Sequence, residues 1–217
     1  MRRFVIIGQT ATASADFRLD DLPSTSGRVD VLLRCVRAAL LVSHGVRRDV
    51  VVDLVLGAGA GHERIVRFVG KDAKFIRPDE RSLATLLKKV LAADTDANPS
   101  GLVEVRPGVW LARGGFEWVI ANLESETPYI LDSLGEDIRE IAAISAPRTA
   151  FFVGDHIGLS DAVRGRLAAL GARSLSVGPV SLHAEDVVAV IANEIDRREA
   201  GPALRHPRGT PEKPAQR

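Results

Sequence analysis

The alternation of strands and helices in the C-terminal third constrains the fold of this chain most strongly. Thr149–Val153 is a continuous apolar run that predicts a buried strand, and the helix after it is capped by Ser160 and ends at Gly171. A second strand, Ser174–Val177, leads into a last helix, His183–Arg197. Because strands joined through a helix pair in parallel with a right-handed crossover, this order predicts an α/β fold.

The N-terminal half carries further strands and helices. Arg3–Ile7 and Asp49–Leu56 are strand candidates, and the second is a nearly continuous β-branched run, typical of a strand covered on both faces. Apolar residues spaced by three and four predict one helix from Val29 to near Ser43-His44-Gly45, and another from Asp79 to Leu91. A chain of 217 residues that is 46% hydrophobic can bury a real core, and one domain is the natural expectation.

The remaining segments carry weaker signals. Val109–Ala112 and Pro128–Leu131 resemble short strands, Phe116–Leu123 a helix, and Ala93–Gly101 a polar connector. Residues 201–217 alternate prolines with basic residues and cannot bury apolar area, so we expect a disordered tail.

A glycine-rich loop, Gly57–Gly61, follows a strand and so suggests nucleotide binding. We reject that interpretation, because Glu63–Gly70 alternates like a strand and the glycines therefore turn a hairpin. A dinucleotide-binding fold also carries an acidic residue about 20 positions further on, where this chain has Arg77.

The charge of the chain is balanced overall but uneven locally. Lys and Arg number 29 against 28 Asp and Glu, so the net charge of +1 does not by itself indicate a nucleic-acid partner. Arginines nevertheless cluster at Arg28, Arg34, Arg37, Arg47 and Arg48, and again at Arg77 and Arg81. Two interpretations stay open for these clusters, a phosphate-binding surface and a set of solvated helix faces.

Other features narrow the compartment and the chemistry. The single cysteine, Cys35, excludes an internal disulfide or a cysteine metal cluster, and it is expected to act as a small buried hydrophobic residue. No apolar run approaches the roughly 20 residues of a membrane span, and the first residues predict a strand rather than a signal peptide. We therefore expect a cytoplasmic protein with no membrane partner.

Two loops are the strongest candidates for a ligand site. Gly154–Gly158 and Gly178–Leu182 each follow a buried strand directly. Ligands of open α/β sheets bind beyond the carboxyl ends of the strands, and glycines there let the backbone approach a ligand closely. The residues alone thus predict a small-molecule pocket and nothing sharper.

Four groups of motifs together point to a known family. They are Gly27-Arg28-Val29-Asp30 with Arg34-Cys35-Val36, Ser43-His44-Gly45-Val46-Arg47-Arg48-Asp49-Val50, Pro78-Asp79-Glu80-Arg81-Ser82, and Gly154-Asp155-His156-Ile157-Gly158 followed by Pro179 and Leu182-His183-Ala184. In this combination the chain resembles the TrmY family, SPOUT enzymes that methylate N1 of pseudouridine 54 in tRNA. The likeness runs to about Arg197 in the order and spacing of the family.

The resemblance implies a SPOUT fold, a parallel sheet with helices on both faces whose last helix is threaded as a trefoil knot. It places one methyltransferase domain at residues 1–200, with an N-terminal half on the RNA side and a knotted cofactor-binding part at about 128–198. It further implies a homodimer that binds S-adenosylmethionine and tRNA. The cofactor contacts carried over are Leu131, Gly154, Val177, Gly178, Pro179, Val180, Ser181, Leu182 and Val187. Position 187 often holds cysteine in the family and is valine here, so a side-chain contact there would come from an isopropyl group instead of a thiol.

For the substrate, the resemblance points to an Arg-x-Asp element and a Pro-x-x-Arg element. The nitrogen N1 of pseudouridine is weakly acidic, so an acceptor for its proton and a cation for the developing anion would help methyl transfer. Asp30 is our candidate acceptor, and Arg81 the candidate anion stabiliser or phosphate clamp. Asp30 has an alternative structural role, pairing with Arg34 one helical turn away. The further RNA-contact candidates are Arg28, Arg34, Arg47, Arg48 and Asp79.

Several histidines and tryptophans have plain structural interpretations. His156 beside Asp155 is expected to order a loop rather than to bind a metal, because no ligand cluster accompanies it. His44 is expected at the end of a helix, and His183 as a cap of the last helix or a residue of the cofactor loop. Trp110 and Trp118 could stack on bases, but core packing competes.

Two rival functions stay open at this point, and a third is distant. The same fold could methylate another pseudouridine or another nucleoside, as in a bacterial member of the family. The chain could instead be a non-catalytic RNA-binding or assembly module with a vestigial cofactor loop. A dinucleotide enzyme built on the glycine-rich loop is the third, and nucleotide binding would test it.

Overall fold

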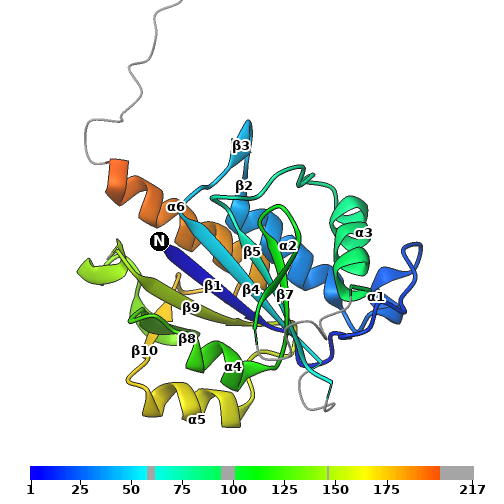
Figure 1. Cartoon of the computed structure of the whole chain (residues 1–217). Helices are drawn as coiled ribbons and strands as arrows, with labels where there is room; N and C mark the ends of the chain where they lie inside the picture. The colour runs from blue at the N-terminus through cyan, green and yellow to red at the C-terminus, as the bar shows by residue number, and fades with distance from the viewer. Residues whose placement is uncertain (58–61, 94–100, 146, 201–217) are drawn as a thin grey trace, which may run out of the picture.

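The computed structural model describes residues 1–57, 62–93, 101–145 and 147–200. A twisted eight-stranded sheet runs through the molecule in the order β10-β8-β9-β1-β4-β5-β7-β6, and helices cover both of its faces (Figure 1). The expected tail at 201–217 lies outside the described residues. No helix among those described is long and apolar enough to cross a membrane.

One half of the sheet is parallel. Its strands are β1 (Arg2–Ile7), β4 (Val50–Leu56), β8 (Thr127–Asp137), β9 (Thr149–Gly154) and β10 (Arg173–Ser176). Strand β1 pairs in parallel with β4 and β9, and β8 pairs in parallel with β9 and β10. Strands β1 and β4 are buried along their whole length, which for β4 confirms the two-sided cover predicted from its apolar run.

The other half is antiparallel, so the sheet is mixed, whereas the resemblance implied a parallel sheet. Its strands are β5 (Arg64–Val69), β6 (Val103–Arg106) and β7 (Val109–Arg113). The physical reason is the short connection from β4 to β5, because a parallel neighbour needs a crossover of a dozen or more residues. The predicted hairpin is thereby confirmed, although residues 58–61 at its tip lie outside the described part. Strand β6 was not predicted.

Within the described ranges, five helices of six or more residues form two layers. On one face lie α2 (Val29–Leu40), α3 (Glu80–Leu91) and α6 (Ala184–Ala200), and on the other lie α4 (Phe116–Ala121) and α5 (Asp161–Ala169). A short helix, α1 (Leu22–Thr25), precedes α2, and a 3-10 turn spans Ala142–Ser145. Phe4 and Ile6 of β1 point to the first layer, whereas Val5 and Ile7 point to the second.

The helix caps and the buried thiol follow the sequence closely. The hydroxyl of Ser160 accepts a hydrogen bond from the Val163 amide at 3.4 Å, which begins α5 as predicted. Cys35 is 0% exposed where α2 packs against α6, and burial raises the pKa of its thiol far above the ordinary value. The expected small hydrophobic role is confirmed.

The end of α2 differs from the prediction. The helix stops at Leu40, and the chain forms a small hairpin from β2 (Leu41–Val42) and β3 (Gly45–Val46). The amide of Arg47 donates to the Leu40 carbonyl at 2.8 Å, which closes the hairpin onto the helix end. His44 therefore lies in the hairpin turn, and its predicted place at a helix end is wrong.

A buried ion cluster lies across the centre of the sheet. Asp53 is 0% exposed, and its carboxylate accepts hydrogen bonds from Arg3 Nε and Arg67 Nε, each at 2.7 Å. The guanidinium of Arg67 also lies over the ring of Trp118, 5.3 Å from its centroid. Trp118 is thus engaged in intramolecular packing, as the structural interpretation of that residue predicted.

Candidate cofactor and substrate site

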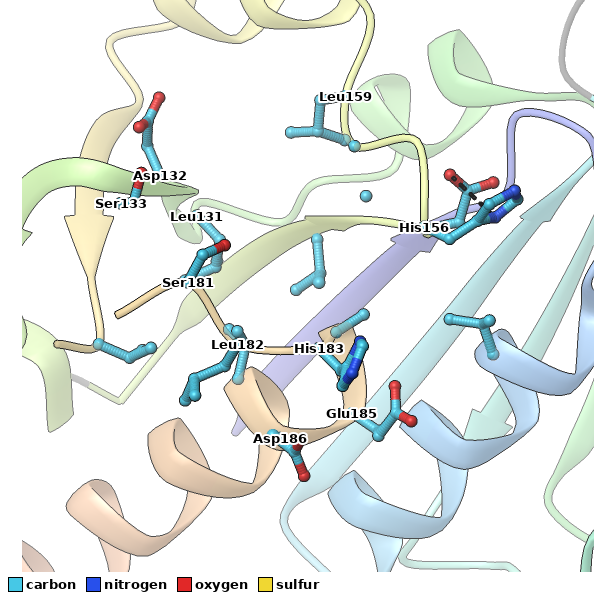
Figure 2. Close-up of a pocket in the computed structure, with 18 of the residues that line it drawn as sticks. Leu131, Asp132, Ser133, His156, Leu159, Ser181, Leu182, His183, Glu185 and Asp186 are labelled. Atoms are coloured by element: carbon cyan, nitrogen blue, oxygen red, sulfur yellow. Dashed lines mark ion pairs between the residues drawn. The ribbon is translucent and has the colours of Figure 1, made fainter. Parts of the chain in front are cut away.

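A cavity of about 770 Å³ opens at the carboxyl ends of β9 and β10, beside the middle of β8 (Figure 2). The two glycine-bearing loops form opposite parts of its wall. Eight of the nine predicted cofactor residues line it, namely Leu131, Gly154, Val177, Gly178, Val180, Ser181, Leu182 and Val187. Pro179 is not among the lining residues. Segments that are separated in the sequence thus lie together at the pocket that the sequence analysis predicted.

The loop after β9 is held by Asp155. Its buried carboxylate accepts the backbone amides of Gln9 at 2.7 Å and Ile157 at 2.9 Å. The side-chain amide of Gln9 in turn donates to the Gly158 carbonyl at 2.7 Å. His156 Nδ1 lies 3.9 Å from the same carboxylate. The prediction that this Asp-His pair orders a loop is confirmed for Asp155.

Two glycines of this loop are required by geometry. A Cβ on Gly154 would lie 2.3 Å from the carbonyl carbon of Gly158, closer than atoms can approach. Gly158 has a φ of +89°, a left-handed conformation that residues with a Cβ rarely adopt. The backbone of the loop therefore folds back on itself directly at the wall of the cavity.

The cavity wall combines apolar residues with charged ones that sequence reasoning missed. Asp132 pairs with Arg164 at 2.8 Å, and Glu185 pairs with Arg34 at 2.7 Å. Asp186, at the start of α6, makes no ion pair with any residue that the structure describes. Asp132 directly follows the predicted strand end at Leu131, so that position was its available signal. No sequence pattern pointed to Arg164.

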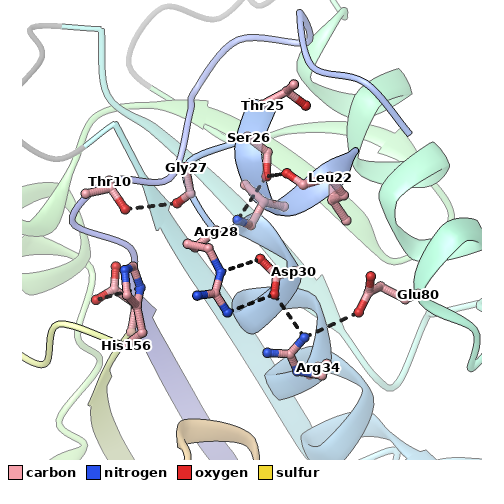
Figure 3. Close-up of polar contacts among 12 residues, drawn as sticks. Thr10, Leu22, Thr25, Ser26, Gly27, Arg28, Asp30, Arg34, Glu80 and His156 are labelled. Carbon is pink, nitrogen blue, oxygen red and sulfur yellow. Dashed lines mark hydrogen bonds and ion pairs between the residues drawn. The ribbon is translucent and has the colours of Figure 1, made fainter. Parts of the chain in front are cut away.

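An ion network borders the cavity on the α2 side (Figure 3). The carboxylate of Asp30 accepts hydrogen bonds from Arg28 Nε at 3.0 Å and Arg28 Nη2 at 3.2 Å, and from Arg34 Nη1 at 3.0 Å. Arg34 also reaches Glu80 of α3 at 3.4 Å. One arginine thus joins helices α2, α3 and α6, since Glu185 begins α6.

Within this network, the arginines face the cavity and the carboxylate lies behind them. Arg28 and Arg34 line the cavity, whereas Asp30 is 2% exposed and does not. Burial alone would raise the pKa of Asp30, but the hydrogen bonds from Arg28 and Arg34 outweigh it and hold the pKa below the ordinary value. Asp30 is therefore ionised and paired, as the structural alternative predicted.

The other residues predicted to contact the substrate lie outside the cavity of their own chain. Arg81 is exposed on α3 and lines a different groove. The side chain of Asp79 caps α3 by accepting the Ser82 amide at 2.8 Å. Arg47 pairs with Asp196 at 2.6 Å, and Arg48 donates to the carbonyls of Gly70 and Lys71, at 3.2 and 2.9 Å.

His183 lies where the second of its two predicted roles placed it, at the cofactor loop. It lines the cavity, and its carbonyl accepts the amides of Asp186 and Val187, each at 3.0 Å, where the last helix begins.

Comparison with known proteins places this geometry in a family. The sequence profile of the family described as "Putative SAM-dependent RNA methyltransferase" matches residues 1–200. The chain belongs to this family. The match covers every helix and strand of the described fold, including both loops of the cavity.

Two proteins that are similar to this chain in sequence carry the same name. The tRNA (pseudouridine(54)-N(1))-methyltransferase of Methanosarcina mazei is 41% identical over 201 residues, which cover 92% of this chain and 93% of that protein. The enzyme of the same name from Halobacterium salinarum is 40% identical over 197 residues, covering 90% and 96%. The family resemblance stated from the motifs is therefore confirmed.

A solved structure shows the same fold. The crystal structure of Archaeoglobus fulgidus Nep1 bound to S-adenosylhomocysteine matches with a TM-score of 0.64 and covers 92% of this chain and 99% of that one. The two sequences are 14% identical, so the likeness concerns the fold alone.

The residues of the cavity fit the cofactor that the family uses, S-adenosylmethionine. Leu131 and Val187 offer apolar contacts to a neutral ring, and the glycine-bearing loops offer backbone groups for hydrogen bonds. Asp186, a carboxylate with no described ion-pair partner, suits the positive charge of a sulfonium or an ammonium group. The volume of about 770 Å³ lies in the range of small-molecule sites.

Proposed function

We propose that this protein transfers a methyl group from S-adenosylmethionine to N1 of pseudouridine 54 in tRNA. The observation that carries the proposal is the cavity, whose wall contains eight of the nine residues that the family resemblance assigns to the cofactor. Relatives about 40% identical over nearly the whole chain, named for this reaction, support the substrate. We place the activity in the cytoplasm.

The cofactor supplies an electrophilic methyl group on sulfur, and the protein would orient it. Leu131, Gly154 and Val187 would hold it, together with the loop from Val177 to Leu182. The pinned backbone of the 154–158 loop gives a preformed wall on one side. Such preorganisation lowers the cost of aligning the methyl group with the incoming nitrogen.

The substrate base would approach from the α2 side. The N1–H bond of pseudouridine would break with loss of its proton to solvent water, so that the ring gains negative charge. A new N1–carbon bond would then replace the sulfur–carbon bond and leave S-adenosylhomocysteine. The guanidinium of Arg28 lines the cavity and would stabilise that negative charge. Asp30 would act through Arg28 by fixing its orientation with two hydrogen bonds. Its direct role as acceptor of the N1 proton stays a prediction, and requires Arg28 to move aside.

We further propose a homodimer and a knotted chain path. Arg81 lies outside the cavity of its own chain, so it would stabilise the anion only in a partner's site, and otherwise would clamp a phosphate. Exposed Ile157, Val180 and Leu182 at the cavity provide apolar surface for a second subunit. The connection from β9 to β10 crosses β8, and the fold matches that of Nep1, both of which are compatible with a threaded last helix.

The decisive experiment uses tRNA that carries pseudouridine at position 54. The purified protein is incubated with this tRNA and S-adenosylmethionine, and nucleosides are analysed by mass spectrometry. We expect N1-methylpseudouridine, and none from tRNA with uridine at that position. Methylation of another nucleoside would redirect the substrate assignment. Calorimetry that detects no binding of S-adenosylmethionine would favour a non-catalytic RNA-binding module.

A further inference from the structure

A second hollow of the molecule, which we call the α3 groove, shares no lining residue with the cofactor cavity. It lies between α3, the segment from Lys74 to Asp79, and the turn from β6 to β7, and its volume is about 740 Å³. Its lining includes Lys74, Phe75, Arg77, Arg81, Lys89 and Arg106.

The α3 groove is strongly and freely cationic. Lys74, Arg77, Arg81, Lys89 and Arg106 are all exposed, and none of them forms an ion pair with a residue in the described ranges. Asp79 is the one acidic residue among the lining residues, and its carboxylate is engaged in capping α3. Cations without carboxylate partners hold a positive potential that favours a polyanion.

An exposed aromatic side chain, Phe75, lines the same groove as these cations. Phe75 is 94% exposed and has a φ of +60°, a conformation that costs free energy in any residue with a Cβ. The backbone just before Phe75 is held in place, because the Ala73 amide donates to the Val69 carbonyl at 2.9 Å and the Lys74 amide to the Pro107 carbonyl at 3.4 Å. The loop thus holds an apolar ring in water, which stabilises nothing within the described chain.

One contact links the helix that lines the α3 groove to the ion network beside the cavity. Glu80, next to Arg81 on α3, contacts Arg34, and Arg34 lines the cavity. A polyanion lying in the groove would therefore continue past the ion network of α2 to the place where the target base would enter.

We propose that the α3 groove binds a single-stranded loop of the tRNA outside the target nucleoside. The cations contact phosphates, and Phe75 stacks on an unpaired base. Stacking on an exposed ring and phosphate contacts by unpaired cations are the two features by which proteins bind unpaired RNA loops. This inference rests on the proposed function, because it takes tRNA as the partner.

The test compares matched variants for affinity toward fluorescent tRNA over a series of KCl concentrations. Phe75→Leu keeps an apolar side chain at the same backbone angle but removes the ring, and we expect affinity to fall about 5- to 100-fold. Phe75→Tyr should restore it. Lys74→Gln with Arg106→Gln should reduce the slope of log affinity against log salt by about 1 for each cation removed. Leu170→Ser and Arg148→Gln, exposed residues away from the groove, are the controls.

Two further readouts separate docking from catalysis. At saturating tRNA, the α3 groove variants should keep kcat within about twofold of the wild type while KM for tRNA rises. Their affinity for S-adenosylmethionine, measured by calorimetry, should not change.

The outcomes distinguish this inference from the function on which it rests. If the wild type methylates tRNA and the groove variants bind tRNA as tightly and with the same salt slope, the groove inference is overturned and the proposed function stands. If the wild type neither binds nor methylates tRNA, both fall. A change of molecular mass in light scattering on Phe75→Leu would make the groove a contact between copies of the chain and would overturn the inference as well.

Discussion

The cofactor cavity and the α3 groove differ in whether their cationic side chains form ion pairs. Around the cavity, Arg28 and Arg34 are tied to Asp30, Glu80 and Glu185 by contacts of 2.7 to 3.4 Å. In the groove, five cations are exposed and none forms an ion pair with a described residue. The first arrangement fixes the position of each guanidinium, and the second leaves side chains free to adapt.

This difference follows from what each ligand demands. A reacting base must meet a charge at a defined point, and a pre-oriented guanidinium costs no reorganisation when the anion develops. A phosphate backbone can be held by long flexible side chains, because its attraction acts over a Debye length of roughly 10 Å at 0.1 M salt. Arginines held in ion pairs are thus suited to stabilising a reacting base, and cations without ion pairs are suited to binding RNA phosphates.

The largest effect that would sharpen this contrast concerns Asp30. Asp30→Asn keeps the shape of the side chain but removes the charge that orients Arg28, so turnover should fall about 100- to 1,000-fold. Affinity for S-adenosylmethionine should stay within about twofold, because Asp30 does not line the cavity. Single-turnover methylation and calorimetry measure the two quantities. Unchanged turnover would show that the paired network serves stability alone.

The next effect concerns the backbone wall of the cavity. Gly154→Ala places a Cβ 2.3 Å from the carbonyl carbon of Gly158, so the loop must shift. Overpacking of this kind costs about 1–3 kcal/mol, and affinity for S-adenosylmethionine should fall roughly 5- to 150-fold. Binding of tRNA in the α3 groove should not change. As a control, Gly165→Ala on α5 has open space around the new Cβ and should bind the cofactor normally.

The sequence predicted the cavity better than it predicted the α3 groove. Strand-loop periodicity and family motifs located Gly154 and the loop up to Leu182, because parallel strands bring their carboxyl ends to one edge. The groove depends on the turn from β6 to β7 meeting α3, and strand β6 was not predicted at all. The sequence therefore could not identify Arg106 and Phe75 as parts of one site, because only the tertiary structure brings them together.

Charge pairing was the other part that sequence could not supply. The clustering of Arg28, Arg34, Arg47 and Arg48 suggested a phosphate surface, but their partners lie as far away in sequence as Asp196 and Glu185. Arg34 and Asp30 are one helical turn apart, so that pair alone followed from spacing. The hairpin after Leu40 escaped prediction because Leu41 and Val42 continue the apolar helical pattern.

A smaller effect separates the two regions by their response to pH. The pKa of Asp30 is lowered in the folded protein, so its pairing contributes stability above the unfolded-state pKa of about 4, and this contribution is lost as the pH falls through the folded-state pKa. Urea unfolding of the wild type and of Asp30→Asn should therefore differ by a constant amount from pH 7 to about 5, and the difference should shrink below about pH 4. Arg106→Gln should show no pH-dependent difference over this range.

The smallest effect is expected at Arg47, a residue that sequence clustering assigned to RNA. Its guanidinium is 17% exposed and pairs with Asp196, which Arg2 also holds at 2.6 Å, so the cluster survives when Arg47 is lost. Arg47→Gln should change tRNA affinity less than about twofold and leave the salt slope unaltered, whereas Arg106→Gln should reduce that slope by about 1. Equal salt slopes for the two variants would break the contrast between paired and unpaired arginines, because a guanidinium already neutralised by carboxylates should release no counterions from the RNA.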